Sequence, residues 1–341
     1  MTDPLPETAA PAGPHSGNAP ALPDITRLPR RGLELNWRYL ALRALAMIFA
    51  IWAAVTVVFF LMMMTGNPAQ LLAGPQAGED QIAALSTLYG FDQPLWMQYL
   101  RFLGASLSGH FPDSLRFGTS PWAVVGPAIP KTLMLGGSAL LLGALLGFAV
   151  GYLSVMARWS LLRELPLAIL TVVQATPVFV IGILMVLLFS LRLHWLPTSG
   201  SESLRHLILP AITLSLLVAP PIARLFRASL IQQLEADHIR TAMAKQIPLH
   251  IVQWRHVALN ALVPSIALLG MQAGSMLGGT VLTETVFGWP GIGTILVSAV
   301  GVQDYPVIIF VVILIALAVS LGNFLADITT FIFDPRTRIA R

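Results

Sequence analysis

The stretch EADHIRTAMAKQIPLHIVQWRHVALNALVP, Glu235–Pro264, carries charges and histidines every few residues inside a chain that is otherwise strongly apolar. Of the 341 residues, 56% are hydrophobic and only 11% are charged, and the mean hydropathy is +0.76. A soluble domain carries roughly 25% charged residues. The composition therefore indicates an integral membrane protein with one unusual polar segment in its second half.

Six stretches are long and apolar enough to cross a bilayer as helices, which takes about 20 residues each. They are Ala44–Met64, Thr132–Met156, Pro166–Leu191, Leu207–Ala223, Val257–Leu282 and Pro306–Phe333. The fourth contains Pro210, Pro220 and Pro221, so we expect a kinked helix inside the bundle, where neighbours satisfy the freed carbonyls. The fold class is accordingly an all-α membrane protein with six transmembrane helices.

Most of the 20 Lys and Arg residues fall on one side of these spans. The excess of basic residues marks the cytoplasmic side, which places both termini and the Glu235 segment in the cytoplasm. The basic residues border apolar spans, so the net charge of +4 does not indicate nucleic-acid binding. The chain has no cysteine, which excludes disulfides and thiolate sites.

The chain divides into segments of different composition. Residues 1–36 are rich in Pro and Ala and predict a disordered cytoplasmic tail. Residues 37–120 hold the first span and a long outer loop, residues 121–334 the core, and residues 335–341 a second tail. In the outer loop, Leu85, Leu88, Leu95, Tyr99 and Phe102 follow helical spacing and predict a pair of short amphipathic helices at the membrane surface.

The polar segment is predicted to form a helix, a turn and a second helix within residues 231–256. An apolar stripe is formed by Ile231, Leu234, Ile239, Ala242, Met243 and Ile247. Asp237 and Arg240 form an i, i+3 pair on another face. On pattern alone, a simple interfacial helix joining spans four and five is favoured over a binding role, because amphipathic linkers are common.

Seven short motifs in order make the chain resemble the permease subunits of bacterial dipeptide, oligopeptide and nickel ATP-binding-cassette (ABC) importers. The first two are Glu235-Ala236-Asp237 with Arg240-Thr241-Ala242 and Ala244-Lys245, and then Arg255-His256 with Asn260-Ala261-Leu262 and Pro264. The others are Tyr89-Gly90 with Asp92-Gln93-Pro94 and Gln98-Tyr99, Trp195–Gly200, Glu284–Phe287 with Trp289–Gly293, Asp304-Tyr305-Pro306 and Asp334-Pro335-Arg336. The resemblance covers about Asn36 to Arg338.

That resemblance implies a type I ABC permease fold in the bacterial inner membrane. The chain then pairs with a second permease, two cytoplasmic ATPases that bind ATP and Mg²⁺, and an outer solute-binding protein, and it moves peptides or similar small solutes inward by alternating access. The implied ATPase-coupling loop consists of Glu235, Ala236, Asp237, Arg240, Thr241, Ala242, Ala244, Lys245, Gln246 and Ile247. The implied outer loop near the binding protein contains Glu284, Trp289, Pro290, Gly291 and Asp304.

Two of these positions raise separate questions. Gln246 stands where the family usually has glycine, and we expect the turn to be rebuilt around Pro248, because a β-carbon in a left-handed conformation costs about 1 kcal/mol. A matched, atypical ATPase or a weakened coupling are the alternatives. For Glu284, a carboxylate lining a pathway competes with one that simply reaches water at a helix end.

Other polar and small residues lie within the spans. Path lining and hydrogen bonding between helices are both possible for Gln174, Thr176, Pro177, Gln272 and Ser275. Two small-residue faces predict close helix packing: Gly136, Gly143, Gly147 and Gly151 in the second span, and Gly274, Gly278 and Gly279 in the fifth.

No enzymatic role is predicted. The chain has no nucleotide-binding loop, HExxH or GxSxG motif, so we expect no ATPase site, no catalytic residue, no metal and no bound cofactor. A stand-alone channel or secondary transporter is the alternative function. A signalling or assembly factor that keeps the permease fold is a weaker one.

Overall fold

The computed structural model describes residues 37–65, 68–73, 77–109, 111–114 and 116–333. The predicted tails at residues 1–36 and 335–341, and the Asp334-Pro335-Arg336 motif, lie outside this part of the chain. Contacts divide the chain into Met1–Ala41 and Leu42–Arg341, and the first unit contributes only the start of α1 to the description.

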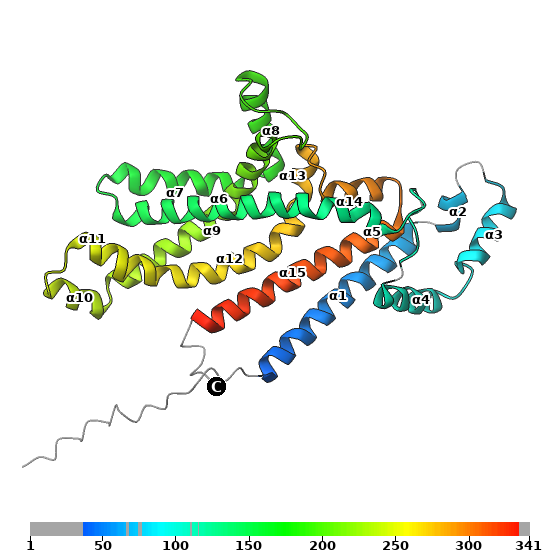
Figure 1. The fold of residues 1–341 in the computed structure, drawn as a ribbon, viewed down its shortest axis with the longest axis horizontal. Helices are drawn as coiled ribbons and strands as arrows, with labels where there is room; N and C mark the ends of the chain where they lie inside the picture. The colour runs from blue at the N-terminus through cyan, green and yellow to red at the C-terminus, as the bar shows by residue number, and fades with distance from the viewer. Residues whose placement is uncertain (1–36, 66–67, 74–76, 110, 115, 334–341) are drawn as a thin grey trace, which may run out of the picture. The chain divides into compact units, whose positions relative to one another are not determined.

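All regular structure in the described ranges is helical. The first half of the chain forms α1 (Trp37–Thr65), α2 (Pro68–Ala73), α3 (Glu79–Tyr89), α4 (Leu95–Ser108), α5 (Pro121–Val125), η2 (Gly126–Ala128), α6 (Ile129–Met156), α7 (Ser160–Ala175), α8 (Val178–Met185) and the π-helical η3 (Val186–Arg192). The second half forms α9 (Leu204–Leu234), α10 (Asp237–Ala244), α11 (Leu249–Ile251), the π-helical η4 (Val252–Ala258), α12 (Leu259–Gly279), α13 (Val281–Val286), α14 (Ile292–Gly301) and α15 (Tyr305–Phe333). Figure 1 shows how these helices are arranged.

Five helical segments are long and apolar enough to cross a membrane, at residues 41–61, 121–156, 204–234, 249–276 and 305–324. They correspond to five of the six predicted spans. The predicted third span, Pro166–Leu191, is instead two helices, α7 and α8–η3, that meet at 109°. This bent pair supplies a sixth span if its two halves are counted together.

The bend at the third span follows from its sequence. Pro177 lacks an N–H, and the residue before a proline is pushed out of the helical region toward extended backbone. Thr176 accordingly has φ −91° and ψ 134°, which ends α7, and α8 begins again at Val178. In Figure 1, α8 leaves the direction of α7 at this point.

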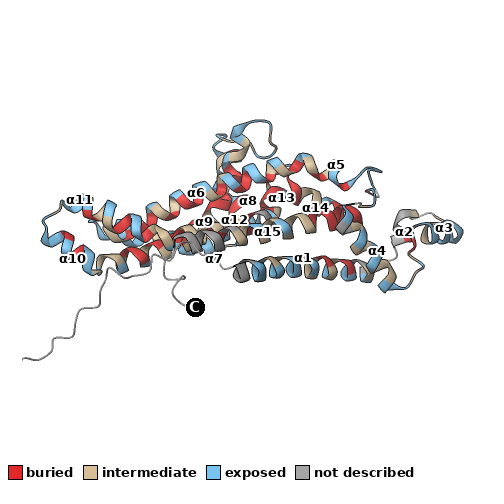
Figure 2. Cartoon of the chain, turned by 60° about the horizontal axis from the view of Figure 1, so that its bottom comes forward, coloured by how far each residue is buried: buried red, intermediate tan, exposed pale blue. Residues whose placement is uncertain are grey.

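The helices differ greatly in burial (Figure 2). In α9, 61% of the most apolar window is buried, whereas in α1 the value is 11%. The prediction that the proline-containing fourth span lies inside the bundle is therefore confirmed. The helix also continues through all three prolines to Leu234, well beyond the predicted end at Ala223.

Two glycine-lined contacts hold the bundle together. An added Cβ at Gly147 of α6 would lie 2.8 Å from the Ala219 carbonyl oxygen of α9, and one at Gly151 would lie 2.9 Å from that of Ala223. Gly143 packs equally closely against α9, but Gly136 does not. The predicted small-residue face of the second span is thus confirmed for three of its four glycines.

The second glycine contact joins α12 to α15. Gly274 lies directly against Gly322, and an added Cβ at Gly270 would lie 2.9 Å from the Cα of Ala326. Gly278 makes only an ordinary contact and Gly279 faces open space, so these two were wrongly assigned to the packing face. Gly270 and Gly322 were missed, because the partner glycine lies about fifty residues away in the chain.

Candidate functional site

The polar segment begins at a break between two helices. Glu235 caps α9, Ala236 takes an extended conformation with φ −72° and ψ 144°, and Asp237 starts α10. A carboxylate in the first turn of a helix favours its N-terminus electrostatically. The break therefore turns the chain out of the long α9 and starts a separate short helix at the end of the bundle (Figure 1).

One face of α10 is anchored to its own chain. Ile239 is 1% exposed, and Ala242 is buried beside it in a cluster with Phe226 and Leu230 of α9. Further buried members of this cluster, from η4 and α12, are Val252, Val257, Ala258 and Ala261. Burial of this kind is worth about 25 cal/mol per Å² of apolar surface, so this face holds α10 against the cluster.

The predicted apolar stripe was only partly right. Ile239 and Ala242 are buried as expected, but Ile231 is 42% exposed and Met243 is 50% exposed. The two buried residues, Ile239 and Ala242, are three positions apart, so Met243 lies at the edge of the buried face. Ala242 packs within its own chain, so its small size serves that contact and leaves Ala244 as the small exposed residue.

The opposite face of α10 carries polar side chains. Exposed residues of the predicted loop are Glu235, Asp237, Arg240, Thr241, Ala244, Lys245 and Gln246. Arg240 Nη1 lies 3.6 Å from Asp237 Oδ1, which confirms the predicted i, i+3 pair. Both side chains are largely in solvent, so this pair contributes little to stability and remains available to a binding partner.

Gln246 occupies a left-handed position at the end of α10, with φ +55°. Its N–H donates to the Met243 carbonyl at 2.9 Å, and the Ile247 N–H donates to the Ala242 carbonyl at 3.3 Å. These two bonds define a Schellman turn, which usually has glycine at this position. The expectation that the turn is rebuilt around Pro248 is therefore wrong: glutamine keeps the glycine-type turn, and Pro248 instead precedes α11.

Beyond the turn the chain returns to the bundle through η4. Trp254 stacks on Tyr152 of α6 with ring centroids 5.1 Å apart, yet remains 61% exposed. Leu249 and Met243 are exposed as well. Three large apolar side chains thus lie on the same segment as the charged face of α10, a feature that the sequence pattern did not single out.

A second group of residues surrounds the buried carboxylate of Glu284, in α13. Its side chain is 0% exposed, which contradicts the expectation that it reaches water. Oε1 accepts a hydrogen bond from Thr132 Oγ1 at 2.7 Å, and Oε2 accepts from the Gly293 N–H at 2.7 Å and from the Thr294 N–H at 3.3 Å. Glu284 therefore caps the N-terminus of α14 and ties it to α6.

The glycines and the tryptophan beside Glu284 fit this arrangement. The Glu284 carboxylate lies against Gly291 and Gly293, where a Cβ would collide with it, and a Cβ at Gly293 would also lie 2.6 Å from the Cα of Val281. Trp289 is fully buried, and its Nε1–H donates to the Lys131 carbonyl at 3.0 Å. Of this motif, Pro290 is exposed.

Asp304 is also internal, at 2% exposure. Ser114 Oγ donates a hydrogen bond to Asp304 Oδ2, which joins the loop before α5 to the start of α15. Glu284, Trp289 and Asp304 thus shape the loops from within. We call Lys131, Thr132, Glu284, Trp289, Gly291, Gly293 and Thr294 the Glu284 cluster.

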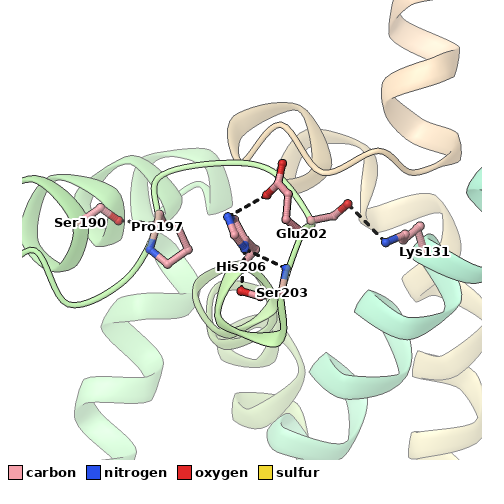
Figure 3. A network of polar contacts seen from close by, with 7 residues as sticks. Lys131, Ser190, Pro197, Glu202, Ser203 and His206 are labelled. Carbon is pink, nitrogen blue, oxygen red and sulfur yellow. Dashed lines mark hydrogen bonds and ion pairs between the residues drawn. The ribbon is translucent and has the colours of Figure 1, made fainter.

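The loop between η3 and α9 is fixed next to this cluster (Figure 3). Ser190 Oγ donates to the Pro197 carbonyl at 3.1 Å, and Lys131 Nζ donates to Ser201 Oγ at 3.3 Å. At the start of α9, His206 Nε2 lies 2.9 Å from Glu202 Oε2. The Gly200 N–H donates to the Phe287 carbonyl at 3.1 Å, so the loop is joined to the end of α13.

Three of the polar residues singled out within the spans form hydrogen bonds. Gln174 Oε1 accepts from Arg224 Nη1 of α9 at 2.7 Å, a bond between helices as one of the two interpretations expected. Thr176 and Ser275 instead bond to carbonyls of their own helices, those of Val172 and Gln272. In the described residues, no group of three or more His, Cys, Asp or Glu side chains could hold a metal ion.

Two protein families match most of the chain between them. Residues 139–339 match the family described as "Binding-protein-dependent transport system inner membrane component", and residues 36–131 match its N-terminal family. The chain is 36% identical over 287 residues to the glutathione transport system permease protein GsiC of Salmonella paratyphi A, covering 84% of this chain and 93% of the relative. It is 34% identical over 301 residues to GsiC of Escherichia coli K12, covering 88% and 98%.

Solved structures of ABC transporters are also similar. An amino acid ABC transporter with histidines matches at 14% identity and a TM-score of 0.49, covering 60% of this chain and 91% of that one. The MetNI methionine ABC transporter in an inward-facing conformation matches at 17% identity and a TM-score of 0.48, covering 60% and 95%. The family comparison identifies ATPase and solute-binding-protein partners. The chain belongs to the binding-protein-dependent transport system inner membrane component family and is a permease subunit of an ATP-driven importer.

Proposed function

We propose that the exposed face of α10 is the surface through which a separate ATPase subunit drives this permease. The face consists of Glu235, Asp237, Arg240, Thr241, Ala244, Lys245 and Gln246, with Met243 on its edge. One observation carries the proposal: α10 is exposed on this side and rigidly packed through Ile239 and Ala242 on the other. A force applied to the exposed side therefore reaches α6, α9 and α12 directly.

The chemistry of this surface suits a soluble protein partner. Charged residues fix the register of an interface, while partly exposed methionine and tryptophan side chains supply the apolar contact that protein interfaces favour. Met243 and Trp254 provide such contacts beside the charged residues. ATP and Mg²⁺ then bind on the ATPase subunits, and this chain only converts their closure into movement of helices.

We also propose a peptide-like substrate and a second, paralogous permease chain. The two relatives described above are named for the transport of glutathione, which is a small peptide carrying several charges. Gln174 and Ser275, two polar residues of the spans, are hydrogen-bonded within the chain, which favours a wide path between two permeases over a tight binding site in one of them. Solute selection then rests mainly on the binding protein.

The test is ATP hydrolysis by the complete complex in lipid vesicles, with and without the binding protein. We expect Glu235→Ala and Met243→Asp to abolish stimulation by the binding protein and to weaken co-purification of the ATPase. Glu164→Ala is the matched control, because Glu164 is an exposed carboxylate of α7 that belongs neither to the α10 face nor to the Glu284 cluster. Unchanged stimulation in Glu235→Ala and Met243→Asp would make α10 a simple connecting helix, and transport without ATP would favour a channel or secondary carrier.

A further inference from the structure

A cavity of about 610 Å³ lies where α1 ends and α15 begins. Its remaining walls come from α4 and from the loop before α5. None of its lining residues belongs to α10 or to the Glu284 cluster. Cavities of this size are typical of sites for small ligands, and none of the roles described above uses this one.

One wall of the cavity is aromatic and continuous with the membrane-facing surface. Phe59 of α1 stacks on Phe102 of α4 with ring centroids 5.2 Å apart, and both rings line the cavity. Ile309 of α15 lies on the same wall. Large apolar side chains of α1 are exposed along much of its length, so acyl chains that cover α1 have a continuous apolar path into the cavity.

Two polar side chains at the cavity are left with unused bonding capacity. Gln98 Nε2 donates to the carbonyls of Phe91, at 3.0 Å, and Gln93, at 2.7 Å, which fixes the orientation of the amide. Its Oε1 is buried without a hydrogen-bond partner among the described residues. Tyr305 is only 7% exposed, and its hydroxyl likewise has no partner there. A buried polar group without a partner costs about 1–3 kcal/mol, so both groups point to an occupant.

Two opposite charges complete the lining. Arg101 and Asp113 both line the cavity and are exposed, and neither forms an ion pair with another described residue. An added Cβ at Gly90 would lie 2.6 Å from Arg101 Nη1, so the glycine leaves room for the guanidinium. Donors and acceptors are therefore both present at the mouth of an apolar cavity.

We propose that this cavity binds one phospholipid with a phosphoethanolamine headgroup. The phosphate accepts hydrogen bonds from Arg101 and the Tyr305 hydroxyl, and the primary ammonium donates to Gln98 Oε1 and Asp113. The acyl chains lie along Phe59 and Ile309 toward the outer surface of α1. Arg binds phosphate well because its donors are fixed in a planar fork, while a quaternary ammonium cannot donate to Gln98 and a glycerol headgroup leaves Asp113 without a cation.

The test uses the full chain in its complex, reconstituted in vesicles of equal parts phosphatidylethanolamine, phosphatidylcholine and phosphatidylglycerol. After mild extraction, native mass spectrometry counts the lipid that remains bound. We expect one phosphatidylethanolamine, enriched about tenfold over the other two lipids. Tyr305→Phe, which removes one oxygen atom, and Arg101→Gln should each lower its retention about tenfold.

Matched controls sit away from the cavity. Tyr152→Phe loses the same oxygen near α10, and Arg116→Gln loses the same charge at an exposed position outside the cavity lining; both should retain the lipid. The proposal fails if the three lipids are retained equally or if phosphatidylglycerol is preferred. It also fails if Tyr305→Phe and Arg101→Gln match their controls, or if Ala105→Cys, in a chain without other cysteines, cross-links to the binding protein in place of lipid.

Discussion

The α10 segment and the Glu284 cluster are both built from short motifs rich in small and charged residues, yet they use their carboxylates in opposite ways. In α10, Asp237 lies almost entirely in solvent and is paired only weakly with Arg240. In the Glu284 cluster, the carboxylate is fully buried and accepts three hydrogen bonds. One region offers its charge to a partner, and the other uses its charge to hold its own helices together.

This difference separates two kinds of mutational effect. A buried carboxylate with fixed donors contributes to stability, because its loss leaves those donors without partners. An exposed carboxylate contributes little to stability and affects function only through what it binds. Substitutions in the Glu284 cluster should therefore change stability, and substitutions on the exposed face of α10 should change ATPase coupling. The four predictions below run from the largest expected change in stability to the smallest.

Glu284→Ala should have the largest effect. The substitution leaves the Thr132 hydroxyl and the Gly293 N–H buried without an acceptor, and it opens a cavity, so we expect a loss of about 3 kcal/mol. Thermal unfolding of the purified chain in detergent measures the change. Glu202→Ala is the control, because its side chain is 76% exposed, and its unfolding temperature should stay close to wild type. Equal stability of the two variants would remove the structural role of Glu284.

Gly147→Val should have the next largest effect. Its side chain would press on the Ala219 carbonyl and on Ile222 of α9, and overpacking of this kind costs about 1–3 kcal/mol. Gly137→Val on the same helix is matched, since nothing lies within 4 Å of a Cβ there. Comparison of the two unfolding temperatures gives the cost of separating α6 from α9. Equal unfolding temperatures of Gly147→Val and Gly137→Val would show that α6 and α9 are not closely packed at Gly147.

Gln246→Gly should stabilise the chain by about 1 kcal/mol, because glycine takes the left-handed conformation without the steric cost of a Cβ. Gln303→Gly should behave alike, since Gln303 has φ +55° and occupies the corresponding position after α14. Lys245→Gly, at φ −79°, should not stabilise. Denaturant unfolding resolves the three variants. Stabilisation by Lys245→Gly would point to a general effect of glycine in this segment.

Asp237→Asn should change stability least, by no more than about 0.5 kcal/mol, because the ion pair that it removes is exposed. Its effect should appear instead in binding-protein-stimulated ATP hydrolysis, if α10 acts as proposed. The same complex with Glu284→Gln should show the reverse pattern, with lowered unfolding temperature and stimulation intact at low temperature. A larger loss of stability in Asp237→Asn than in Glu284→Gln would show that the exposed carboxylate, and not the buried one, holds the helices together.

The sequence predicted the membrane spans well because hydropathy is a local property. It predicted one span over Pro166–Leu191 but not the bend within it, since an apolar run has the same hydropathy whether it is straight or bent at Thr176-Pro177. It also ended the fourth span at Ala223, because the polar residues among 224–234 lower the hydropathy, whereas α9 continues to Leu234. The structure extends that helix through contacts with other helices, which composition does not reveal.

In the candidate site, too, features set by nearby residues were predictable and features set by distant residues were not. The helix, turn and helix of α10 were predictable, because helical spacing and the charge of Asp237 and Arg240 lie within one short window. The burial of Glu284 was not, because its main side-chain partner, Thr132, lies 152 residues away in the sequence. The left-handed conformation of Gln246 was misjudged since the two hydrogen bonds of the turn offset the cost of its Cβ.

The glycine contacts of α6 have a consequence for genetic suppression. At Gly147 and Gly151, the nearest obstacle to a larger side chain is a backbone carbonyl of α9, which every amino acid possesses. No second substitution on α9 can remove that obstacle, so intragenic suppressors of defects at these positions should not map to the facing residues. At Gly182 the obstacles are the side chains of Phe287 and Val286, 3.2 and 3.3 Å away. Defects there should be suppressed by smaller residues at either position, and a revertant screen would separate the two classes of glycine by where its second-site mutations fall.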